Sequence, residues 1–478
     1  MLARWFSLDV RSLAVFRIAL GLLLVADAGL RSRDFSLMFA ADGIFPPRLI
    51  REYFDHDPSQ WSLALWHEDI RWAGAILGAE AVAGACLIAG WWTTVATVVA
   101  WVAQVSIFRR TIPAANAGDL WLSCLLFWSC FLPLGATWSL DARRRPAGPR
   151  EVCGPAAAVL VLQVMAVYLG AGLSKWNESW FNGEAVRHAL SVHDHGTSLG
   201  TWLTGADWLV NLVSWGVVAF EILGPLLFVA WPRARLAIAA AFILFHVTIW
   251  VTMSVGLFAP IGIVAWLPLL PGTVWGRAEP TPQPPGIDCP STVARWLCVV
   301  AALLAAVSFV RDRTPWRDRP LPVAVQRGIH LFSLTQEWGM FGVVPPLEQW
   351  AYGRALLADG RVVDPLREGR PVGDDRPADG FTSLRHHRWH KLMWILPRNK
   401  VRPFAPCVAR SLAAEWNGRH PAAERIVALE IRFAQRNAVD PAAPVTEMLV
   451  GAWPDVDAAG SGNLERFLEA AGAGRAAD

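Results

Sequence analysis

The chain has 478 residues, of which 54% are hydrophobic and 17% charged, and its net charge is +3. Its mean hydropathy of +0.34 excludes an ordinary soluble globular protein, and the small net charge gives no sign of nucleic-acid binding. The 27 tryptophans against 3 tyrosines suit many aromatic anchors at membrane interfaces. We therefore predict a polytopic membrane protein whose surroundings are the lipid bilayer.

Metal ligation finds little support in the sequence. The 7 cysteines show no CxxC or CxxH spacing, and most lie in or beside apolar segments, so we interpret them as small buried residues. His193 and His195 in "SVHDHGTSLG" are spaced like a pair of metal ligands, but no third ligand accompanies them, and we interpret them as loop residues. No metal is predicted.

Apolar stretches long enough to span a bilayer, or nearly so, recur through the first two thirds of the chain. They lie at 12–30, 71–91, 93–108, 118–135, 155–174, 208–231, 234–253, 255–271 and 292–310. Two of them are short, so eight or nine transmembrane helices are expected. The first has a charge ahead of it, as a signal peptide would, but it contains Arg17 and Asp27 and lacks a convincing cleavage site, so we predict a retained helix.

The character of the sequence changes after residue 311. A DG turn at 359–360 inside "WAYGRALLADGRVVDP" predicts a β-hairpin; "ERIVALEIRFAQ" reads as a strand and "VARSLAAEWNGRH" as a helix. The fold class is therefore an all-α polytopic membrane domain followed by a small α+β extramembrane domain, in which no catalytic constellation is visible. The predicted boundaries are 1–275 for the membrane domain, 276–311 for a linker and the last transmembrane helix, 312–455 for the α+β domain and 456–478 for a flexible tail.

Arginine clusters bear on the orientation. Those at 143–150 and 233–235 would be cytoplasmic if the N-terminus is inside, whereas the arginines at 31–51 argue the other way. With nine spans and a cytoplasmic N-terminus, the C-terminal domain lies outside. The Ala/Arg-rich composition suits a bacterium with a GC-rich genome, and we expect a multi-pass protein of the inner (plasma) membrane.

Ionisable residues inside apolar segments are costly, and they mark either a functional interior or a buried pair. For Arg17, Asp27 and Glu80 we favour structural pairing with one another. His246 lies deep in "FILFHVTIWVTMSVGLFAP". It is either a core histidine bonded to a carbonyl or a hydrogen-bond donor and proton relay that faces Lys175.

Lys175 is one of only three lysines, with Lys391 and Lys400, among 43 basic residues. It ends the apolar run in "YLGAGLSKWNESWFNG". A desolvated lysine can lose its proton and act as a base, which arginine cannot do. The alternative is a lysine that reaches from a helix end toward lipid headgroups. Its polar and aromatic neighbours, Trp176, Asn177, Trp180, Asn182 and His188, could form one wall of a wet pocket.

Five blocks of sequence, taken in order, resemble the HTTM-domain proteins, the bacterial branch of the superfamily that contains vitamin K-dependent gamma-carboxylase. The resemblance covers about residues 7–275. The blocks are "FRIALGLLLVADAGLRSRDFSLMFAADGIFPPRLI", "NAGDLWLSCLLFWSCFLPLGATWSLDA", "YLGAGLSKWNESWFNG", "FEILGPLLFVAWPRAR" and "FHVTIWVTMSVGLFAPIGIVAWLPLLPG". The stretch from "QEWGMFGVVPP" to "KLMWILP" also resembles the region that follows this domain in bacterial members.

The resemblance implies a mechanism. In the carboxylase, a lysine deprotonates vitamin K hydroquinone, oxygen converts the quinol to a strong base, and that base removes a glutamate proton before carbon dioxide adds. The lysine corresponds to Lys175, and the family's histidine corresponds to His246, with Ser254, Gly256 and Phe258 behind it. Reduced quinone of the vitamin K or menaquinol type, oxygen and carbon dioxide are thus the expected co-substrates.

Departures from the family pattern are visible as well. The catalytic histidine of the eukaryotic enzyme has no counterpart between Phe108 and Asp141, where Asn116 and Asp119 stand instead. The large lumenal domain is replaced by a smaller tail, which argues against processive carboxylation. We expect the quinone and substrate pocket to be lined by Asn116, Asp119, Trp176, Trp180 and Glu221.

Two functions follow from these observations. The first is a gamma-carboxylase-like membrane enzyme acting on a peptide or small-molecule substrate, with Lys175 as base and His246 as its partner. The second is a non-catalytic membrane scaffold, assembly factor or lipid-binding protein on the same fold. A transporter has little support, because no internal repeat is visible.

Overall fold

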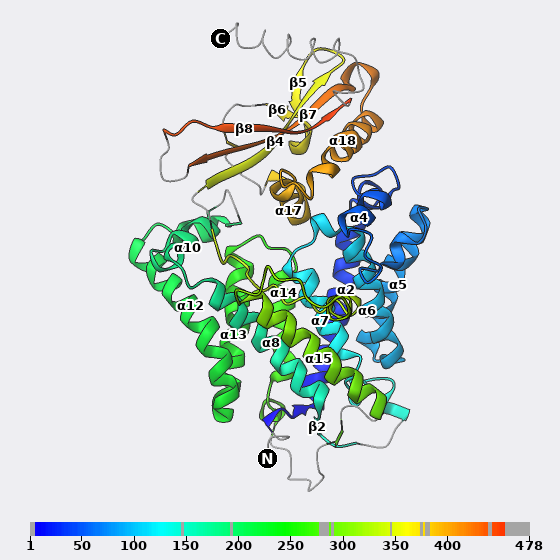
Figure 1. Ribbon diagram of the computed structural model, residues 1–478, viewed down its shortest axis with the longest axis vertical. Coiled ribbons are helices and arrows are strands. Elements are labelled where there is room, and N and C mark those ends of the chain that lie inside the picture. The colour runs from blue at the N-terminus through cyan, green and yellow to red at the C-terminus, as the bar shows by residue number, and fades with distance from the viewer. Residues whose placement is uncertain are drawn as a thin grey trace.

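The computed structural model describes residues 5–144, 148–191, 195–276, 286–287, 291–344, 347–372, 376–377, 383–437 and 442–454. A helical bundle carries a sheet-containing domain at one end, and α2 begins at the opposite end of the bundle (Figure 1). The predicted tail, most of the predicted linker and His193 lie outside the described residues.

Six helices of the described chain are long and apolar enough to cross a membrane. They are α2 (Val10–Ser32), α5 (Ile70–Ala89), α8 (Pro155–Ser174), α12 (Asp207–Ala230), α13 (Arg235–Thr252) and α15 (Thr292–Asp312). The predicted count of eight or nine is not confirmed. Of the other expected spans, α6 (Thr93–Arg110) is less apolar, while α7 (Ala117–Ser129) and α14 (Phe258–Trp266) have 13 and 9 residues. At the rise of an α-helix these two reach only about 20 and 14 Å into a hydrocarbon layer of about 30 Å.

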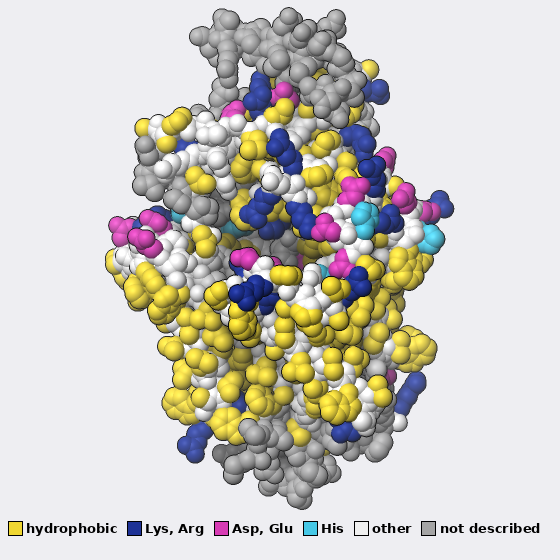
Figure 2. Space-filling model, in the orientation of Figure 1, with side chains coloured by type: hydrophobic (Ala, Val, Ile, Leu, Met, Phe, Trp, Pro, Cys, Tyr) yellow, Lys and Arg dark blue, Asp and Glu magenta, His cyan; other side chains and the backbone are white. Residues whose placement is uncertain are grey.

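The outer surface of the bundle is that of a membrane protein. Large aliphatic side chains on its outer helices are more than half exposed; they include Leu212, Leu223, Leu226, Leu244, Val251 and Leu303. Hydrophobic side chains form a continuous band over the bundle, and charged side chains gather between this band and the C-terminal domain (Figure 2). So large an apolar surface is unfavourable in contact with water and favourable in contact with lipid.

Close helix contacts depend on glycine. A Cβ on Gly21 of α2 would lie 2.5 Å from the carbonyl oxygen of Gly84 in α5, and one on Gly172 of α8 would lie 2.8 Å from Cγ1 of Ile222 in α12. Small residues allow such approach of helix backbones in membranes. The second contact matters for function, because it brings the end of α8 against α12.

The C-terminal domain contains a five-stranded sheet in the order β6-β5-β4-β7-β8. Its strands are β4 (Leu347–Leu357), β5 (Val362–Asp364), β6 (Arg370–Pro371), β7 (Ile426–Asn437) and β8 (Thr446–Trp453), all paired antiparallel. The predicted hairpin is confirmed: β4 and β5 pair, and Gly360 in their turn has φ of +89°. The predicted strand and helix are present as β7 and α18 (Ala405–Arg419).

Helix α17 (His387–Ile395) lies between the sheet and the bundle (Figure 1). Its Arg388 is 3% exposed and reaches into the membrane domain. Nη2 of Arg388 lies 2.8 Å from Asp27 of α2 and 2.9 Å from Asp119 of α7, and Nη1 lies 3.0 Å from the other oxygen of Asp119. Arg31 binds the same two carboxylates at 2.5 and 2.6 Å. Two arginines and two aspartates therefore form a closed, buried cluster, the Arg388 cluster.

The expected pairing of Arg17, Asp27 and Glu80 with one another is wrong. Asp27 pairs within the Arg388 cluster, Arg17 donates to the carbonyl oxygen of Trp138 at 2.6 Å, and neither Glu80 oxygen has a hydrogen-bond partner among the described residues. The reason is geometric: Arg31 lies one turn from Asp27 on the same helix face, and the second cation arrives from the C-terminal domain.

Arg388→Met should loosen the C-terminal domain from the bundle. It leaves two buried carboxylates with one cation, a change that costs on the order of 3–5 kcal/mol in comparable buried pairs. Thermal unfolding in lipid nanodiscs and protease sensitivity of the C-terminal domain measure the effect. Arg48→Met is the matched control, because the ion pair of Arg48 with Glu52 is at the exposed surface. Equal behaviour of the two variants would contradict this role for Arg388.

Candidate functional site

Lys175 immediately follows α8 and does not reach toward lipid headgroups, since it is 4% exposed. Its Nζ lies 2.8 Å from Oε2 of Glu221 in α12, and Glu221 is 6% exposed. Nζ also lies 5.3 Å from the centroid of the Trp180 ring. The close packing at Gly172 places the two charged groups together, so the Lys175–Glu221 pair is a product of the contact between α8 and α12.

His246 of α13 stands at the end of a hydrogen-bond chain. The Trp266 indole N–H lies 2.7 Å from the Tyr168 hydroxyl oxygen, and that oxygen lies 2.7 Å from Nε2 of His246. An indole nitrogen only donates, so the Tyr168 oxygen accepts from Trp266. Among the described residues, Nε2 of His246 is the acceptor within reach of the Tyr168 proton, and we assign the tautomer of His246 on that ground. Neutral His246 then carries its proton on Nδ1, which has no hydrogen-bond partner among the described residues.

The position of the His246 ring is set by packing as well. A Cβ on Gly262 of α14 would lie 2.2 Å from Cε1 and 2.3 Å from Nδ1 of His246. Only glycine leaves room for the ring there. His246 is thus a buried histidine bonded to a hydroxyl, not the carbonyl-bonded core histidine that was one alternative, and it retains a free N–H donor.

Lys175, Glu221 and His246 line a common cavity of about 180 Å³, the inner cavity. Tyr168, Trp121 and Trp180 are among its other walls, and most of the remaining lining is aliphatic or aromatic. Val213 of α12 and Thr248 of α13 line the cavity and are also exposed on the outer surface, where these two helices form one edge of the bundle (Figure 1). The inner cavity therefore approaches the lipid phase between α12 and α13.

Three residues expected in this pocket lie elsewhere. Trp176 is 67% exposed and packs edge-on against Phe181. Asp119 is held in the Arg388 cluster, so its charge is already neutralised. Asn116 caps α7: its Oδ1 accepts from the backbone N–H groups of Gly118 and Asp119, the capping box written in "NAGD". Trp180 and Glu221 do line the inner cavity with Lys175.

Tyr168 and the ion pair between Lys175 and Glu221 were not anticipated. Tyr168 precedes Lys175 by seven residues, two turns along one face of the same helix, and that spacing was the available signal. No comparable signal in the sequence connects Glu221 with Lys175.

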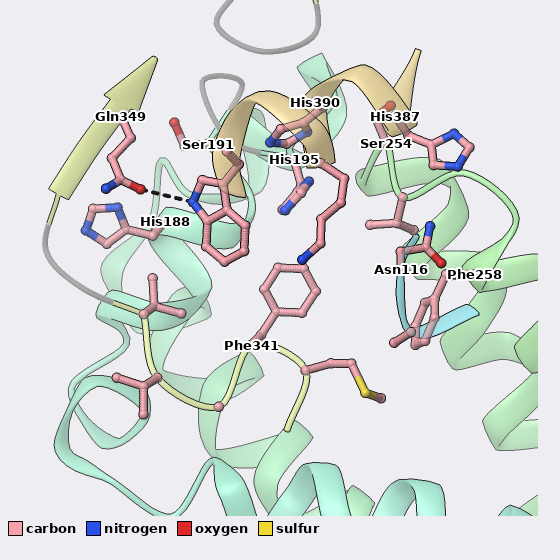
Figure 3. Close-up of a pocket in the computed structure, with 18 of the residues that line it drawn as sticks. Asn116, His188, Ser191, His195, Ser254, Phe258, Phe341, Gln349, His387 and His390 are labelled. Carbon is pink, nitrogen blue, oxygen red and sulfur yellow. Dashed lines mark hydrogen bonds between the residues drawn. The ribbon is translucent and has the colours of Figure 1, made fainter. Parts of the chain in front are cut away.

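A second cavity, of about 380 Å³, lies between the bundle and the C-terminal domain; we call it the interdomain cavity. Asn116, His188 and His195 line it from the bundle, and His387 and His390 line it from α17 (Figure 3). The rings of His195 and His390 lie 4.4 Å apart. No group of three or more His, Cys, Asp or Glu side chains in the described chain is arranged to hold a metal ion.

A sequence model of the HTTM domain matches residues 6–275. The chain belongs to the HTTM family. This domain is the one found in vitamin K-dependent carboxylase-like proteins. Comparison with curated proteins and with solved structures finds no match. In this HTTM protein, Lys175, Glu221 and His246 all lie inside the matched region, whereas α17 lies outside it.

Lys175→Met and Glu221→Leu should each destabilise the protein by on the order of 3–5 kcal/mol, because each leaves one charge buried and unpaired. The double variant removes both charges, so it should cost much less than the sum of the two. Unfolding of all four proteins in the same lipid measures the coupling. Additive losses would show that the two side chains do not act as a pair.

Proposed function

We propose that this HTTM protein is a membrane enzyme that oxidises a reduced quinone with oxygen and uses the reaction to deprotonate and carboxylate a peptide or small-molecule substrate. The single observation that carries the proposal is the Lys175–Glu221 pair facing an apolar cavity that is also lined by His246, whose Nδ1 has no hydrogen-bond partner among the described residues. A few convergent polar groups in a largely apolar pocket are typical of an active site.

The inner cavity suits the head group of a quinol. An engineered apolar cavity of about 150 Å³ binds benzene, and the inner cavity, at about 180 Å³, offers comparable room with polar groups from two sides. A quinol hydroxyl needs an acceptor for its proton and a donor for its oxygen, which the Lys175–Glu221 pair and Nδ1 of His246 supply. The isoprenoid tail would leave between α12 and α13.

The Lys175–Glu221 pair can accept a proton, and it carries no net charge before it does so. Whether the shared proton rests on Nζ or on Oε2, the pair is neutral overall, and uptake of one proton yields an ammonium and a carboxylic acid with net charge +1. That charge stabilises negative charge developing on the bound molecule, since the apolar walls screen it weakly. When bound, a reduced quinone would supply electrons to oxygen and so generate the strong base needed to deprotonate a carbon acid.

Water would quench such a base, so the inner cavity must stay dry. Its wall toward the C-terminal domain includes Phe258, Met340 and Phe341, which also line the interdomain cavity. Trp121 packs against both His246 and Phe258, with ring centroids 5.8 Å apart in each case. Phe258, Met340 and Phe341 thus form the boundary that the two cavities share, across which a substrate would meet the base.

We further place the protein in the inner (plasma) membrane of a bacterium, with the start of α2 in the cytoplasm and the C-terminal domain outside. Support comes from arginines near the start of α2. Arg143 and Arg144 precede β2 (Glu151–Cys153), which pairs with β1 (Leu8–Asp9) directly before α2, and Arg233 and Arg235 stand where α12 passes into α13, at the same end of the bundle (Figure 1). Basic residues flanking transmembrane helices are enriched on the cytoplasmic side.

Lys175→Arg should abolish oxygen-dependent oxidation of menaquinol. The guanidinium cannot become the neutral amine that accepts the quinol proton when the shared proton rests on Oε2 of Glu221, and its fixed charge makes the Glu221 carboxylate a weaker base. The loss should therefore reach at least about 100-fold, the contribution of a general base. Turnover is measured in nanodiscs at matched thermal stability, with Lys400→Arg at the exposed surface as the control. Equal turnover by the two variants, or no turnover by the wild type with several quinols and added carbon dioxide, would favour a non-catalytic scaffold.

Tyr168→Phe should lower kcat by roughly tenfold, because His246 loses the hydroxyl that holds its proton on Nδ1. Tyr168 thus acts by positioning His246, the general acid–base group. The measurement is a double-mutant cycle with His246→Ala. Tyr168→Phe should have no further effect once His246 is removed. A full additional loss in the His246→Ala background would assign Tyr168 a role of its own.

A further inference from the structure

The interdomain cavity has the size of a ligand site and lies outside the proposed quinol site. Its volume of about 380 Å³ falls in the range of small-molecule pockets, roughly 300–1,000 Å³. His387 and His390 of α17 lie on one side of it, Phe341 lies opposite, and Asn116, Ser254 and Phe258 lie on the flank (Figure 3). The surface is hollowed at this level, between the C-terminal domain and the hydrophobic band (Figure 2).

Lys391 of α17 lines this cavity. Among the described residues its ammonium has no ion-pair or hydrogen-bond partner, and Nζ lies 4.7 Å from the centroid of the Trp394 ring. Burial, with Arg398 nearby, lowers the pKa of Lys391 to about 8. An amine held in this way is positioned to meet an anion from outside the chain.

The other charged groups of the cavity are already satisfied. Glu348 also lines it, but its carboxylate is bound by Arg376 at 2.8 Å and by Arg436 at 2.6 Å. Burial lowers the pKa of His387 to about 3 and that of His390 well below its ordinary value, so both rings are neutral near pH 7. Lys391 is therefore the one uncompensated lysine or arginine charge in the described lining.

Neutral groups beside Lys391 indicate which other features a bound ligand should have. Asn116 uses its Oδ1 to cap α7, and its amide nitrogen has no partner among the described residues, so it offers a donor. Met340, Phe341, Val343 and Val344 supply an apolar wall. One cation, one amide donor and an apolar wall suit a monoanion with an organic body better than a doubly charged phosphate.

We propose that the interdomain cavity binds a small organic carboxylate, with Lys391 as its counter-ion. The site itself does not depend on the quinol chemistry. Its role in the reaction rests on the proposed function: Phe258, Met340 and Phe341 line both cavities, so a carboxylate bound at Lys391 extends its carbon chain toward the wall behind which the strong base forms. The interdomain cavity is then the chamber for the carbon acid.

The chain's few lysines provide a direct test. Wild-type protein in nanodiscs is acetylated with an amine-reactive reagent, and Lys391 and the exposed Lys400 are followed in the same sample by peptide mass spectrometry. Hexanoate at about 10 mM, enough to fill a site with a Kd of about 1 mM, should slow labelling of Lys391 at least fivefold and leave Lys400 unchanged. Hexanamide, which has the same body without the charge, should protect neither.

Equal protection of Lys391 by hexanoate and hexanamide, or no protection by either, would overturn the proposal. Protection by inorganic phosphate but not by hexanoate would overturn the choice of carboxylate. The assay contains no quinol, so its outcome is independent of the turnover of Lys175→Arg. Protection without any quinol turnover would leave the carboxylate site in place and remove its role as a substrate chamber.

Variants test the counter-ion separately from the fold. Lys391→Arg should retain the rise in thermal stability that hexanoate gives the wild type, and Lys391→Gln should lose it. Lys400→Gln is the matched control and should behave as the wild type. A hexanoate shift of unchanged size in Lys391→Gln would contradict the assignment, and if that variant does not fold, the labelling of the wild type decides.

Discussion

The Arg388 cluster is the constraint on which the arrangement of the two domains depends. Two carboxylates contributed by α2 and α7 would be prohibitively costly inside the bundle with Arg31 alone. Arg388 completes their neutralisation, and it can do so only if α17 lies against the membrane domain. The positions of His387, His390 and Lys391 are thereby fixed as well, since these residues lie on the same helix. The interdomain cavity thus exists where it does because a buried charge balance fixes α17.

A second constraint is the geometry of α8. Its small residues let α12 approach at Gly172, which pairs Lys175 with Glu221. Two turns earlier, the same helix carries Tyr168, which receives the Trp266 N–H and fixes the tautomer of His246. One helix therefore supplies the proposed base and sets the orientation of its partner. The two polar systems meet in a space that is otherwise apolar, where charge and hydrogen bonds are strongest.

Sequence patterns predicted features that are local in the chain. The membrane class, the hairpin around Gly360, and the burial of polar groups at Lys175 and His246 all follow from composition, turn residues or a polar residue in an apolar run. Pairings across long separations could not be predicted, because a single sequence shows a charge without its partner: Asp119 and Arg388 are 269 residues apart. The expected count of eight or nine spans is not confirmed, because apolar runs such as those of α7 and α14 form helices of only 13 and 9 residues, and length and composition alone do not decide whether such helices cross.

The central claim is that the inner cavity holds a quinol head group between the Lys175–Glu221 pair and His246. The most direct measurement is an experimental structure of the protein in lipid nanodiscs with menaquinol under anaerobic conditions. The result predicted is density for the head group within hydrogen-bond distance of both Nζ of Lys175 and Nδ1 of His246, with the tail leaving between α12 and α13. A head group bound elsewhere, or an inner cavity filled by side chains at saturating menaquinol, would contradict the claim.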